Sequence, residues 1–346
     1  MRIALLADAG SVHTQRWVGG LESLGHTVEV WSQRPGPVGR VRMLPDPRSW
    51  RMDVPAAVWQ IRGQVRAFRP DIVHAHYLSH YGLFGALASV APLVVSVWGA
   101  DIECFPRSHG ILTQKVVSWI LQRADAITAS SHYLKEVTAR YTSKPIAVIP
   151  FGIDLGRFQP QPAGDGPLRF VINKALEPVY GIDIILEALK DVPGPWQGRI
   201  LGRGSQEARL RQMARDYQID TRLEWPGAVP LDALPRELAR ADVGLYASRR
   251  ESFGVAPLEM MALGRAAIAH RTGGLSEVIR DKQTGYLVEP GAARAWREVL
   301  TQAVSDPQSL RRLGANGPGW VASHYDFAEN LAQMQTLYED IIRKAG

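Results

Sequence analysis

The sequence predicts an α/β protein built from two doubly wound, Rossmann-like domains that face each other across a cleft. Short apolar runs alternate with helical patterns along the chain, which is typical of parallel sheets covered by helices. A stretch rich in proline and glycine at 159–167 interrupts this alternation and indicates a linker. The length of 346 residues also exceeds what one hydrophobic core usually supports. We therefore expect an N-terminal domain over 1–160 and a C-terminal domain over 161–324.

The expected strands are short, apolar and poor in charge, as strands buried on both faces are. In the first domain they cover 3–7, 28–31, 72–73, 93–97, 126–128 and 146–149. In the second domain they begin at residue 168 and continue with 199–201, 223–225, 243–246 and 266–269. Ligands are expected at the carboxyl ends of these strands.

One segment, 81–100, carries no charge and is nearly long enough to cross a membrane. Pro92 lies in its middle, so a helix ending at residue 90 and a strand over 93–97 fit it better than a membrane span. The first apolar run ends at Asp8 and is too short for a signal peptide. Since Cys104 is the single cysteine and fits a reducing compartment, we expect a cytoplasmic protein.

The formal charge of +6 is moderate, and an excess of arginine is confined to 34–69. No basic motif with interleaved aromatic residues accompanies it, so nucleic acid is not an expected partner. The predicted helix over 54–68 has an apolar side that includes Ile61 and Val65, while Arg62 and Arg66 lie elsewhere. This pattern fits a peripheral contact with the inner face of an anionic membrane, and it equally fits an ordinary helix with a solvated basic face.

The densest pattern in the chain surrounds a predicted helix over 254–264. Glu259 shares the apolar stripe of this helix with Val255 and Leu263. A carboxylate there is costly without hydrogen-bond donors, and the two hydroxyls of a ribose would supply them. Glu251 precedes the helix, and the N–H groups after Ser252 form a seat for phosphate at the positive end of the helix dipole. Carboxylate, anion seat and carboxylate follow the order of groups along a nucleotide sugar.

Glu251 and Glu259, separated by seven residues and followed by Gly273, Gly274 and Glu277, resemble the signature of the family 4 retaining glycosyltransferases. The resemblance implies the GT-B fold, with a C-terminal helix at 325–346 that packs back on the first domain. It implies a retaining hexosyltransferase that works without a metal or other cofactor. The expected donor is a UDP- or GDP-sugar, and the expected acceptor is a hydroxyl of a sugar, lipid-linked or small molecule. Glycan, glycolipid and cell-surface polysaccharide synthesis are the processes it implies.

The resemblance also assigns roles on the donor side. Glu251 would contact the hydroxyls of the donor sugar, and Glu259 would hold the ribose. Gly202 begins a glycine turn, with Arg203 as its second residue, that resembles the family's turn near the base. The peptide groups expected to contact sugar and diphosphate belong to Ser252, Phe253, Gly254 and Val255.

Lys174 is the expected phosphate ligand because it follows a predicted strand end. Many members of the family carry an arginine near this position and a lysine just before the glycine that opens the next helix. Here Tyr180 precedes Gly181, so one positive charge is missing. Arg203 or Arg250 are the alternatives for the second cation, and the sequence leaves both open.

The acceptor side is expected at the carboxyl ends of strands in the first domain. Trp98 stands where many members have the histidine of a His-Gly-x-Asp motif, and it can stack on a sugar ring but cannot accept a hydrogen bond. A metal bound by His74 and His76 is not expected, since no third ligand is evident. The candidates for acceptor or sugar contact are Gly10, His13, His76, Trp98 and Asp101.

Two other functions fit parts of the pattern. A nucleotide-sugar epimerase shares the fold and donor pocket but needs an acid and a base beside the sugar ring, for which Glu251 and His76 are available. A non-catalytic nucleotide-sugar binding protein is suggested by the departures from the family at Tyr180 and Trp98. Formation of an epimer without acceptor would identify the first, and binding without turnover would identify the second.

Overall fold

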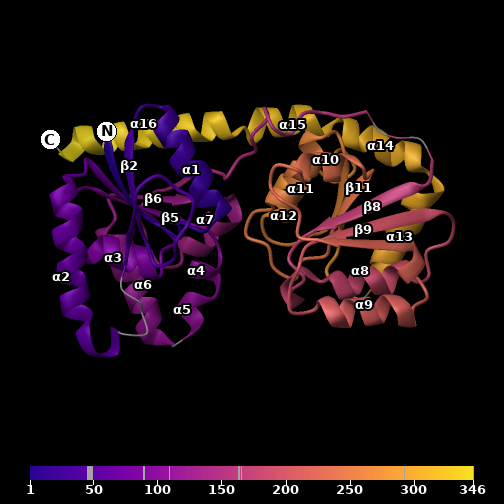
Figure 1. Ribbon diagram of the computed structural model, residues 1–346, viewed down its shortest axis with the longest axis horizontal. Helices are drawn as coiled ribbons and strands as arrows, with labels where there is room; N and C mark the ends of the chain where they lie inside the picture. The colour runs from indigo at the N-terminus through magenta and orange to yellow at the C-terminus, as the bar shows by residue number, and fades with distance from the viewer. Residues whose placement is uncertain are drawn as a thin grey trace. The chain divides into compact units, whose positions relative to one another are not determined.

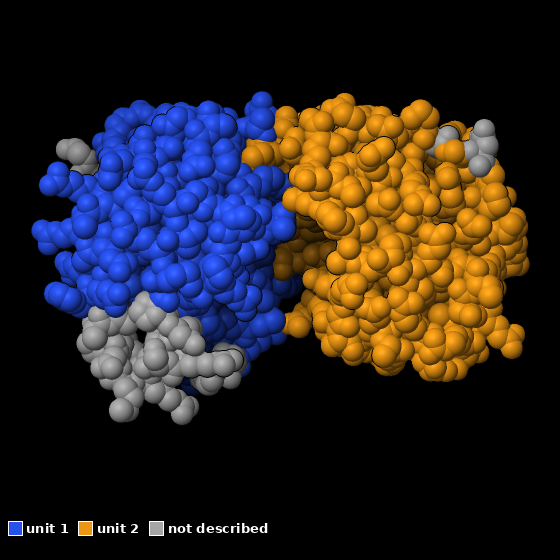
Figure 2. Space-filling view, in the orientation of Figure 1, with its two compact units in different colours: residues 1–151, 328–346 blue, residues 152–327 orange. Residues whose placement is uncertain are grey.

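The computed structural model describes residues 1–346 apart from 45–49, 89, 109, 163, 165, 292 and 346. The chain forms two compact units, coloured separately in Figure 2. Unit 1 comprises Met1–Phe151 and Ala328–Gly346, and unit 2 comprises Gly152–Phe327. The stretch 159–167, expected as a linker, falls within unit 2, and its residues 163 and 165 lie outside the described part.

Unit 1 contains a parallel sheet of seven strands in the order β3-β2-β1-β4-β5-β6-β7. Figure 1 labels β2, β5 and β6 of this sheet among its helices. Its strands are β1 Arg2–Leu6, β2 Thr27–Ser32, β3 Val41–Met43, β4 Ile72–His76, β5 Leu93–Val97, β6 Ala126–Ala129 and β7 Ile146–Val148. The predicted strands of this domain are confirmed. The additional strand β3 lies at the sheet edge and is largely exposed, so it has no apolar run.

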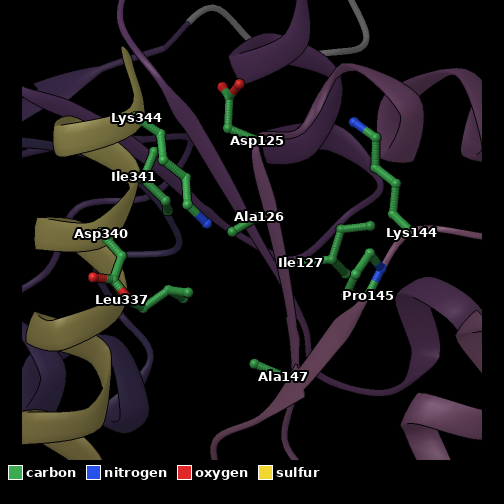
Figure 3. A pocket seen from close by; sticks show the side chains of 10 residues that line it. All are labelled: Asp125, Ala126, Ile127, Lys144, Pro145, Ala147, Leu337, Asp340, Ile341 and Lys344. Carbon is green, nitrogen blue, oxygen red and sulfur yellow. The ribbon is translucent and has the colours of Figure 1, made fainter. Parts of the chain in front are cut away.

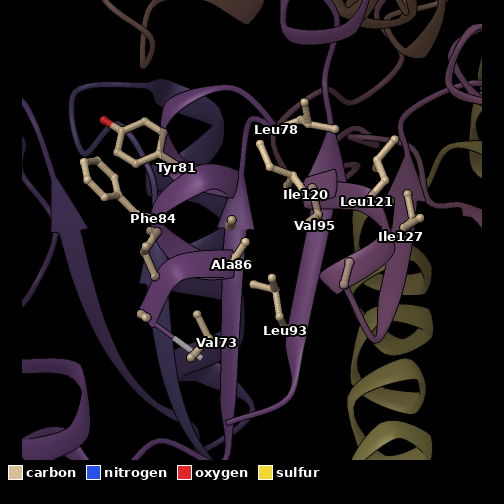
Figure 4. Close-up of a cluster of buried hydrophobic side chains, with 14 of the residues drawn as sticks. Val73, Leu78, Tyr81, Phe84, Ala86, Leu93, Val95, Ile120, Leu121 and Ile127 are labelled. Atoms are coloured by element: carbon tan, nitrogen blue, oxygen red, sulfur yellow. The ribbon is translucent and has the colours of Figure 1, made fainter. Parts of the chain in front are cut away.

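The helices of unit 1 follow its strands, as in a doubly wound fold. They are α1 Val12–Ser23, α2 Trp50–Phe68, α3 His80–Ala88, α4 Ala100–Glu103, α5 Phe105–Ser108, α6 Ile111–Arg123, α7 His132–Thr138 and the final helix α16 Phe327–Ala345. The apolar sides of α2, α3 and α6 bury Ile61, Phe84 and Ile120 against the sheet. Figure 4 shows this core, in which Leu93 and Val95 of β5 meet the side chains of α3 and α6.

The charge-free segment divides as the proline predicts, into α3 and β5. Ser89, within the predicted helix, lies outside the described residues. Gly85 lets α3 approach the sheet, since a Cβ there would lie 2.7 Å from Leu93 Cδ1. Within the described part of the chain, no helix is long and apolar enough to cross a membrane.

A buried polar network joins α16 to the sheet of unit 1. His74 Nδ1 lies 2.6 Å from the hydroxyl of Tyr338, and its Nε2 lies 2.7 Å from Ser96 Oγ. Ser96 Oγ is in turn 2.6 Å from Thr128 Oγ1. Burial lowers the pKa of His74 to about 3, so the imidazole is neutral at physiological pH. These bonds anchor the last helix at the middle of the sheet.

Unit 2 contains a parallel sheet of six strands in the order β10-β9-β8-β11-β12-β13. Its strands are β8 Leu168–Asn173, β9 Trp196–Leu201, β10 Leu223–Gly227, β11 Val243–Tyr246, β12 Ala266–His270 and β13 Gly285–Val288. Its helices are α8 Ile182–Leu189, α9 Glu207–Asp216, α10 Leu234–Ala239, α11 Val255–Ala262, α12 Leu275–Val278, α13 Ala293–Ser305, α14 Pro307–Ala315 and α15 Gly317–His324, with short 3-10 turns η2 Pro178–Tyr180 and η3 Asp220–Arg222.

A buried carboxylate holds the amino-terminal side of this sheet together. Asp242 precedes β11, and its side chain is fully buried. Its Oδ2 accepts hydrogen bonds from the backbone N–H of Arg169 at 3.0 Å and from that residue's guanidinium at 3.2 Å. Arg311 of α14 donates to the other oxygen at 3.3 Å. These bonds fix the amino-terminal ends of the strands, and the carboxyl ends carry the polar residues described next.

Candidate active site

The candidate site of unit 2 lies where β8 and β11 end. These strands are neighbours in a parallel sheet, so their carboxyl ends meet at one edge. β8 ends at Asn173 and is followed by Lys174, whereas β11 ends at Tyr246 and is followed by the loop that carries Glu251. The two chain segments therefore bring the predicted cation and the first predicted carboxylate together.

Lys174 and Glu251 form an ion pair. The ammonium nitrogen of Lys174 lies 2.6 Å from Oε2 of Glu251, and the two side chains are only 12% and 15% exposed. Ser248 Oγ donates to the same carboxylate oxygen at 3.1 Å. The pair thus places an ammonium and a carboxylate side by side at the ends of the strands, where a phosphate and a sugar hydroxyl could each find a complementary group.

Glu259 has a protein partner that the sequence did not identify. Asn173 Nδ2 donates to Oε2 of Glu259 at 3.1 Å, and Tyr246 donates to Asn173 Oδ1 at 2.8 Å. Burial, and then the nearby carboxylates of Glu259 and Glu251, raise the pKa of Tyr246, so its hydroxyl remains a donor. The side chain of Glu259 is half-buried, not enclosed. It therefore remains accessible to a ligand while its orientation is set from within.

The helix α11 begins between the two glutamates. Gly254 caps it with φ of +118°, a conformation that a residue with a Cβ rarely adopts, and Pro257 occupies its first turn. The first N–H groups of this helix have no partner within the helix itself, which is the usual arrangement for binding an anion. The Phe253 side chain is buried beside Tyr325, so its peptide group is the part suited to ligand contact.

Close backbone contacts explain the glycines of the motif. A Cβ on Gly202 would lie 2.1 Å from the carbonyl oxygen of Lys174, and one on Gly204 would lie 2.4 Å from that of Leu176. A Cβ on Gly274 would lie 2.4 Å from Phe253 Cα. These glycines let the loops around Lys174 and α11 pack on their neighbours.

The sequence leaves two arginines open as the second cation. Both of them, Arg203 and Arg250, are exposed, whereas the side chains of Lys174 and Glu251 are largely buried. Instead the ring of Tyr180 lies against Lys174, with 4.9 Å between its centroid and Nζ.

Most of the predicted acceptor-side residues of unit 1 form one aromatic cluster. The Trp98 ring is 4.3 Å from that of His76 and 5.0 Å from that of Phe151, and His13 stacks on Phe151 at 4.4 Å. His76 is only 2% exposed, and its Nδ1 has no hydrogen-bond partner among the described residues. Burial lowers the pKa of His76 well below its ordinary value, and His74 and His13 lower it further. Trp98 and His13, which are half-buried, are therefore the members that a ligand could reach.

Asp101 positions the loop that carries Trp98. The carboxylate is 1% exposed and accepts hydrogen bonds from the backbone N–H groups of Leu78 at 2.7 Å, Gly99 at 2.7 Å and Trp98 at 3.2 Å. Burial raises the pKa of Asp101 to about 6, although these bonds oppose the shift. Because the Asp101 carboxylate is buried and already accepts these backbone hydrogen bonds, its surroundings favour a role in positioning the loop over the direct sugar contact expected from the sequence.

Gly10 lies on the turn after β1, where its N–H donates to Asp8 Oδ1 at 2.9 Å. Among the residues that the structure describes, no group of three or more His, Cys, Asp or Glu could hold a metal.

A separate cavity of about 380 Å³ lies in unit 1 between α16 and the amino-terminal ends of β6 and β7 (Figure 3). Lys344 of α16 extends toward Ala126, and Ile127 and Pro145 form apolar lining. Lys144 is engaged with the carbonyl oxygen of Ala124 at 2.6 Å, which closes the end of α6. The cavity lies at the amino-terminal ends of the strands, whereas Trp98 follows the carboxyl end of β5, so the cavity is separate from the aromatic cluster.

The chain is similar to known glycosyltransferases in family models, in sequence and in fold. The model of the glycosyl transferases group 1 matches residues 157–320, and that of the glycosyl transferase 4-like proteins matches 2–131. N-acetyl-alpha-D-glucosaminyl L-malate synthase of Bacillus anthracis is 24% identical over 292 residues, covering 79% of this chain and 75% of its own. The GDP-mannose-dependent alpha-(1-6)-phosphatidylinositol monomannoside mannosyltransferase of Mycolicibacterium smegmatis is 25% identical over 287 residues, covering 74% and 75%. The structure of Anabaena HepE in complex with UDP-glucose aligns with a TM-score of 0.83 at 18% identity, covering 98% of this chain and all of that one.

The two parallel α/β units have the GT-B fold, and the family models and relatives define a glycosyltransferase that uses a nucleotide-sugar donor. The chain belongs to the group 1, or family 4, glycosyltransferases.

Proposed function

We propose that the site of unit 2 binds a nucleoside diphosphate sugar, with the ribose on Glu259, the diphosphate on Lys174 and the first peptide groups of α11, and the sugar beside Glu251. The observation that carries this proposal is the placement of Glu259 and the Lys174–Glu251 pair around one sheet edge and one helix N-terminus. The peptide groups of Ser252, Phe253, Gly254 and Val255 and the turn at Gly202 and Arg203 complete the proposed donor contacts.

The reaction is transfer of a hexosyl group with retention at the anomeric carbon. The bond from this carbon to the leaving diphosphate breaks, and a bond to the acceptor oxygen forms on the same face. Negative charge grows on the diphosphate as the first bond stretches, and Lys174 and the amides of α11 stabilise that charge. A leaving phosphate oxygen takes the acceptor proton, so the reaction needs neither a protein nucleophile nor a metal. UDP- and GDP-sugars are both candidate donors, since HepE was solved with UDP-glucose and the mycobacterial relative is GDP-mannose-dependent.

The acceptor is proposed to bind unit 1 at Trp98 and His13, with His76 packed beneath them. An aromatic face of this kind suits the apolar side of a sugar ring. Asp101 holds the Trp98 loop in place, and Gly10 remains a candidate on the neighbouring turn. The relatives support a sugar, a lipid-linked acceptor or a small molecule without choosing among them.

We also propose that the enzyme acts in the cytoplasm, in peripheral contact with an anionic membrane. Two surfaces of unit 1 support this. On α2, Trp59 is 80% exposed and lies one turn from the exposed Arg62. On α6, which has no acidic residue, Ile111 and Leu112 are each 72% exposed. Apolar side chains with basic neighbours suit the interface of anionic lipids. More of the protein should sediment with phosphatidylglycerol vesicles than with phosphatidylcholine vesicles. Trp59→Ala and Leu112→Ser should remove this difference. Equal sedimentation of the unaltered protein with both kinds of vesicle would refute the membrane contact.

The donor proposal is tested by calorimetric titration with a panel of UDP- and GDP-sugars. With the best ligand, Lys174→Ala and Glu259→Ala should each lose affinity while the thermal midpoint stays close to that of the wild type. Glu298→Ala, an exposed pair partner of Arg294 on α13, is the matched control and should bind normally. Unchanged binding in both site variants would mean that the donor binds elsewhere.

Turnover then separates the transferase from the two other functions. Transfer to an added acceptor, with release of the nucleoside diphosphate, supports the proposal. An epimer formed without acceptor would indicate an epimerase, in which Glu251 and His76 would have to act as acid and base. Tight binding without turnover across a broad acceptor panel would indicate a binding protein.

A further inference from the structure

The aromatic ring of Tyr180 and the carboxylate of Glu251 hold the Lys174 ammonium between them. The distance from Nζ to the ring centroid is 4.9 Å, which is within the range of a cation–π interaction. The distance from Nζ to Oε2 of Glu251 is 2.6 Å. Because Lys174 is only 12% exposed, both contacts act on a largely desolvated charge, where they are stronger than in open solvent.

The loop that carries Lys174 and Tyr180 is fixed by backbone hydrogen bonds. Leu176 N–H donates to the carbonyl oxygen of Arg203 at 2.9 Å, and Arg249 N–H donates to that of Val179 at 2.8 Å. The backbone that carries the ring is therefore tied to the turn after β9 and to the loop after β11. The position of the ring beside the ammonium is a built feature of the sheet edge.

Two further contacts fix the ends of this loop. Glu177 accepts hydrogen bonds from Ser205, at 2.8 Å from its N–H and 2.5 Å from its hydroxyl. Gly181 follows Tyr180 with φ of +61°, and a Cβ there would lie 2.1 Å from the carbonyl oxygen of Ala247. The chain turns closely past β11 directly after Tyr180, which leaves the ring facing Lys174.

A lysine ammonium has three N–H donors, and among the described residues that of Lys174 donates to Glu251. An aromatic face attracts the cation through its quadrupole but is not a charged competitor for it. Such a partner holds the ammonium in place and leaves N–H groups for phosphate oxygens. A second carboxylate at this position would instead neutralise the charge.

We propose that Tyr180 is a positioning residue for the donor diphosphate, which it serves by fixing the Lys174 ammonium through the face of its ring. This inference rests on the proposed role of Lys174 in donor binding. Where the resemblance to family 4 leads one to expect a lysine before Gly181, this chain has a ring that orients the ammonium of Lys174.

The test compares Tyr180→Phe with Tyr180→Leu in calorimetric titrations. The probes are inorganic pyrophosphate, UDP and GDP, with uridine and guanosine as controls that lack phosphate. Phenylalanine keeps the ring and should bind the phosphates as the wild type does, whereas leucine should weaken them by about 2- to 30-fold. Nucleoside binding should not change. In a Lys174→Met background the leucine substitution should have no further effect.

A graded measurement keeps the proposal testable if the leucine variant does not fold. Phenylalanine at position 180 with an increasing number of ring fluorines keeps its shape and loses its attraction for a cation, so pyrophosphate affinity should fall stepwise. A flat series, or wild-type pyrophosphate affinity in a folded Tyr180→Leu variant, would overturn the role of Tyr180 alone. A wild-type protein that binds neither UDP, GDP nor pyrophosphate would overturn the donor site itself, and this inference with it.

Discussion

Replacing Glu259 by glutamine tests the ribose contact with the smallest change in shape. Asn173 Nδ2 donates to Oε2 of Glu259 at 3.1 Å, and Tyr246 holds the Asn173 amide in that orientation. A glutamine must therefore turn its own oxygen toward Asn173, because two amide N–H groups would otherwise face each other. Its NH2 group then points to the place where a ribose hydroxyl would donate, and a donor meets a donor.

The magnitude follows from the loss of a charged acceptor. A hydrogen bond to a charged group contributes about 1.5–3 kcal/mol, so losing one such bond raises the dissociation constant by roughly 10- to 150-fold. Calorimetry with UDP and GDP measures this value. The thermal midpoint should change little, since the half-buried side chain keeps its bond to Asn173.

A ligand that lacks the 2′- and 3′-hydroxyls completes the cycle. The wild type should bind the dideoxy nucleoside diphosphate more weakly than the natural one, whereas Glu259→Gln should bind both alike. If the variant still prefers the natural ligand as strongly as the wild type does, Glu259 does not hold the ribose, and the reasoning from its apolar helix stripe is wrong.

Three further predictions concern the frame of the two units. Gly202→Ala should lower the free energy of unfolding by about 1–3 kcal/mol and weaken nucleotide binding, because the new Cβ would lie 2.1 Å from the Lys174 carbonyl oxygen and disturb that loop. The control is Gly19→Ala on α1, where the Cβ meets open space, and it should leave the measured dissociation constant unchanged. Asp242→Asn should lower the free energy of unfolding in urea by about 3–5 kcal/mol, because the carboxylate it removes is buried and paired. Asp340→Asn removes a carboxylate from an exposed pair and should lower the same free energy by under about 1 kcal/mol. Equal losses in the two variants would contradict the role of burial. Burial lowers the pKa of His74 from 6.5 to about 3, so below pH 6.5 the unfolded chain binds a proton that the native state does not bind. The free energy of unfolding should therefore fall by up to roughly 5 kcal/mol between pH 6.5 and 3. In urea unfolding, this free energy should depend less steeply on pH in His74→Asn than in the wild type, and an equal slope would refute the assignment.

The sequence predicted the fold well because most strands are buried on both faces and therefore stand out as apolar runs. The strands it did not predict, β3 and β13, lie at sheet edges and are partly exposed, so their composition resembles that of a loop. The helices were recognised where capping and apolar spacing agree, as at α11, which Gly254 begins. Edge strands depend on pairing with a neighbour, and pairing is a tertiary property.

The candidate site was predictable only in part. Lys174 and Glu251 were chosen separately, and the structure places them in contact. The partners Asn173, Tyr246 and Ser248 were not predicted, because each is an ordinary polar residue whose role depends on which strands are adjacent. All three residues lie at or just after the end of a strand. The alternation of strands and helices in the sequence predicts where strands end, so it could have indicated these positions.

The division of the chain has a consequence for its synthesis. Tyr338, which bonds to His74 at the centre of the first sheet, is synthesised only after the whole of unit 2. Translation must therefore pass through the whole of Gly152–Phe327 before the first half of the protein can acquire its final helix. A nascent chain holds an unfinished first unit throughout that interval, and a stop codon shortly before Ala328 would leave it unfinished permanently.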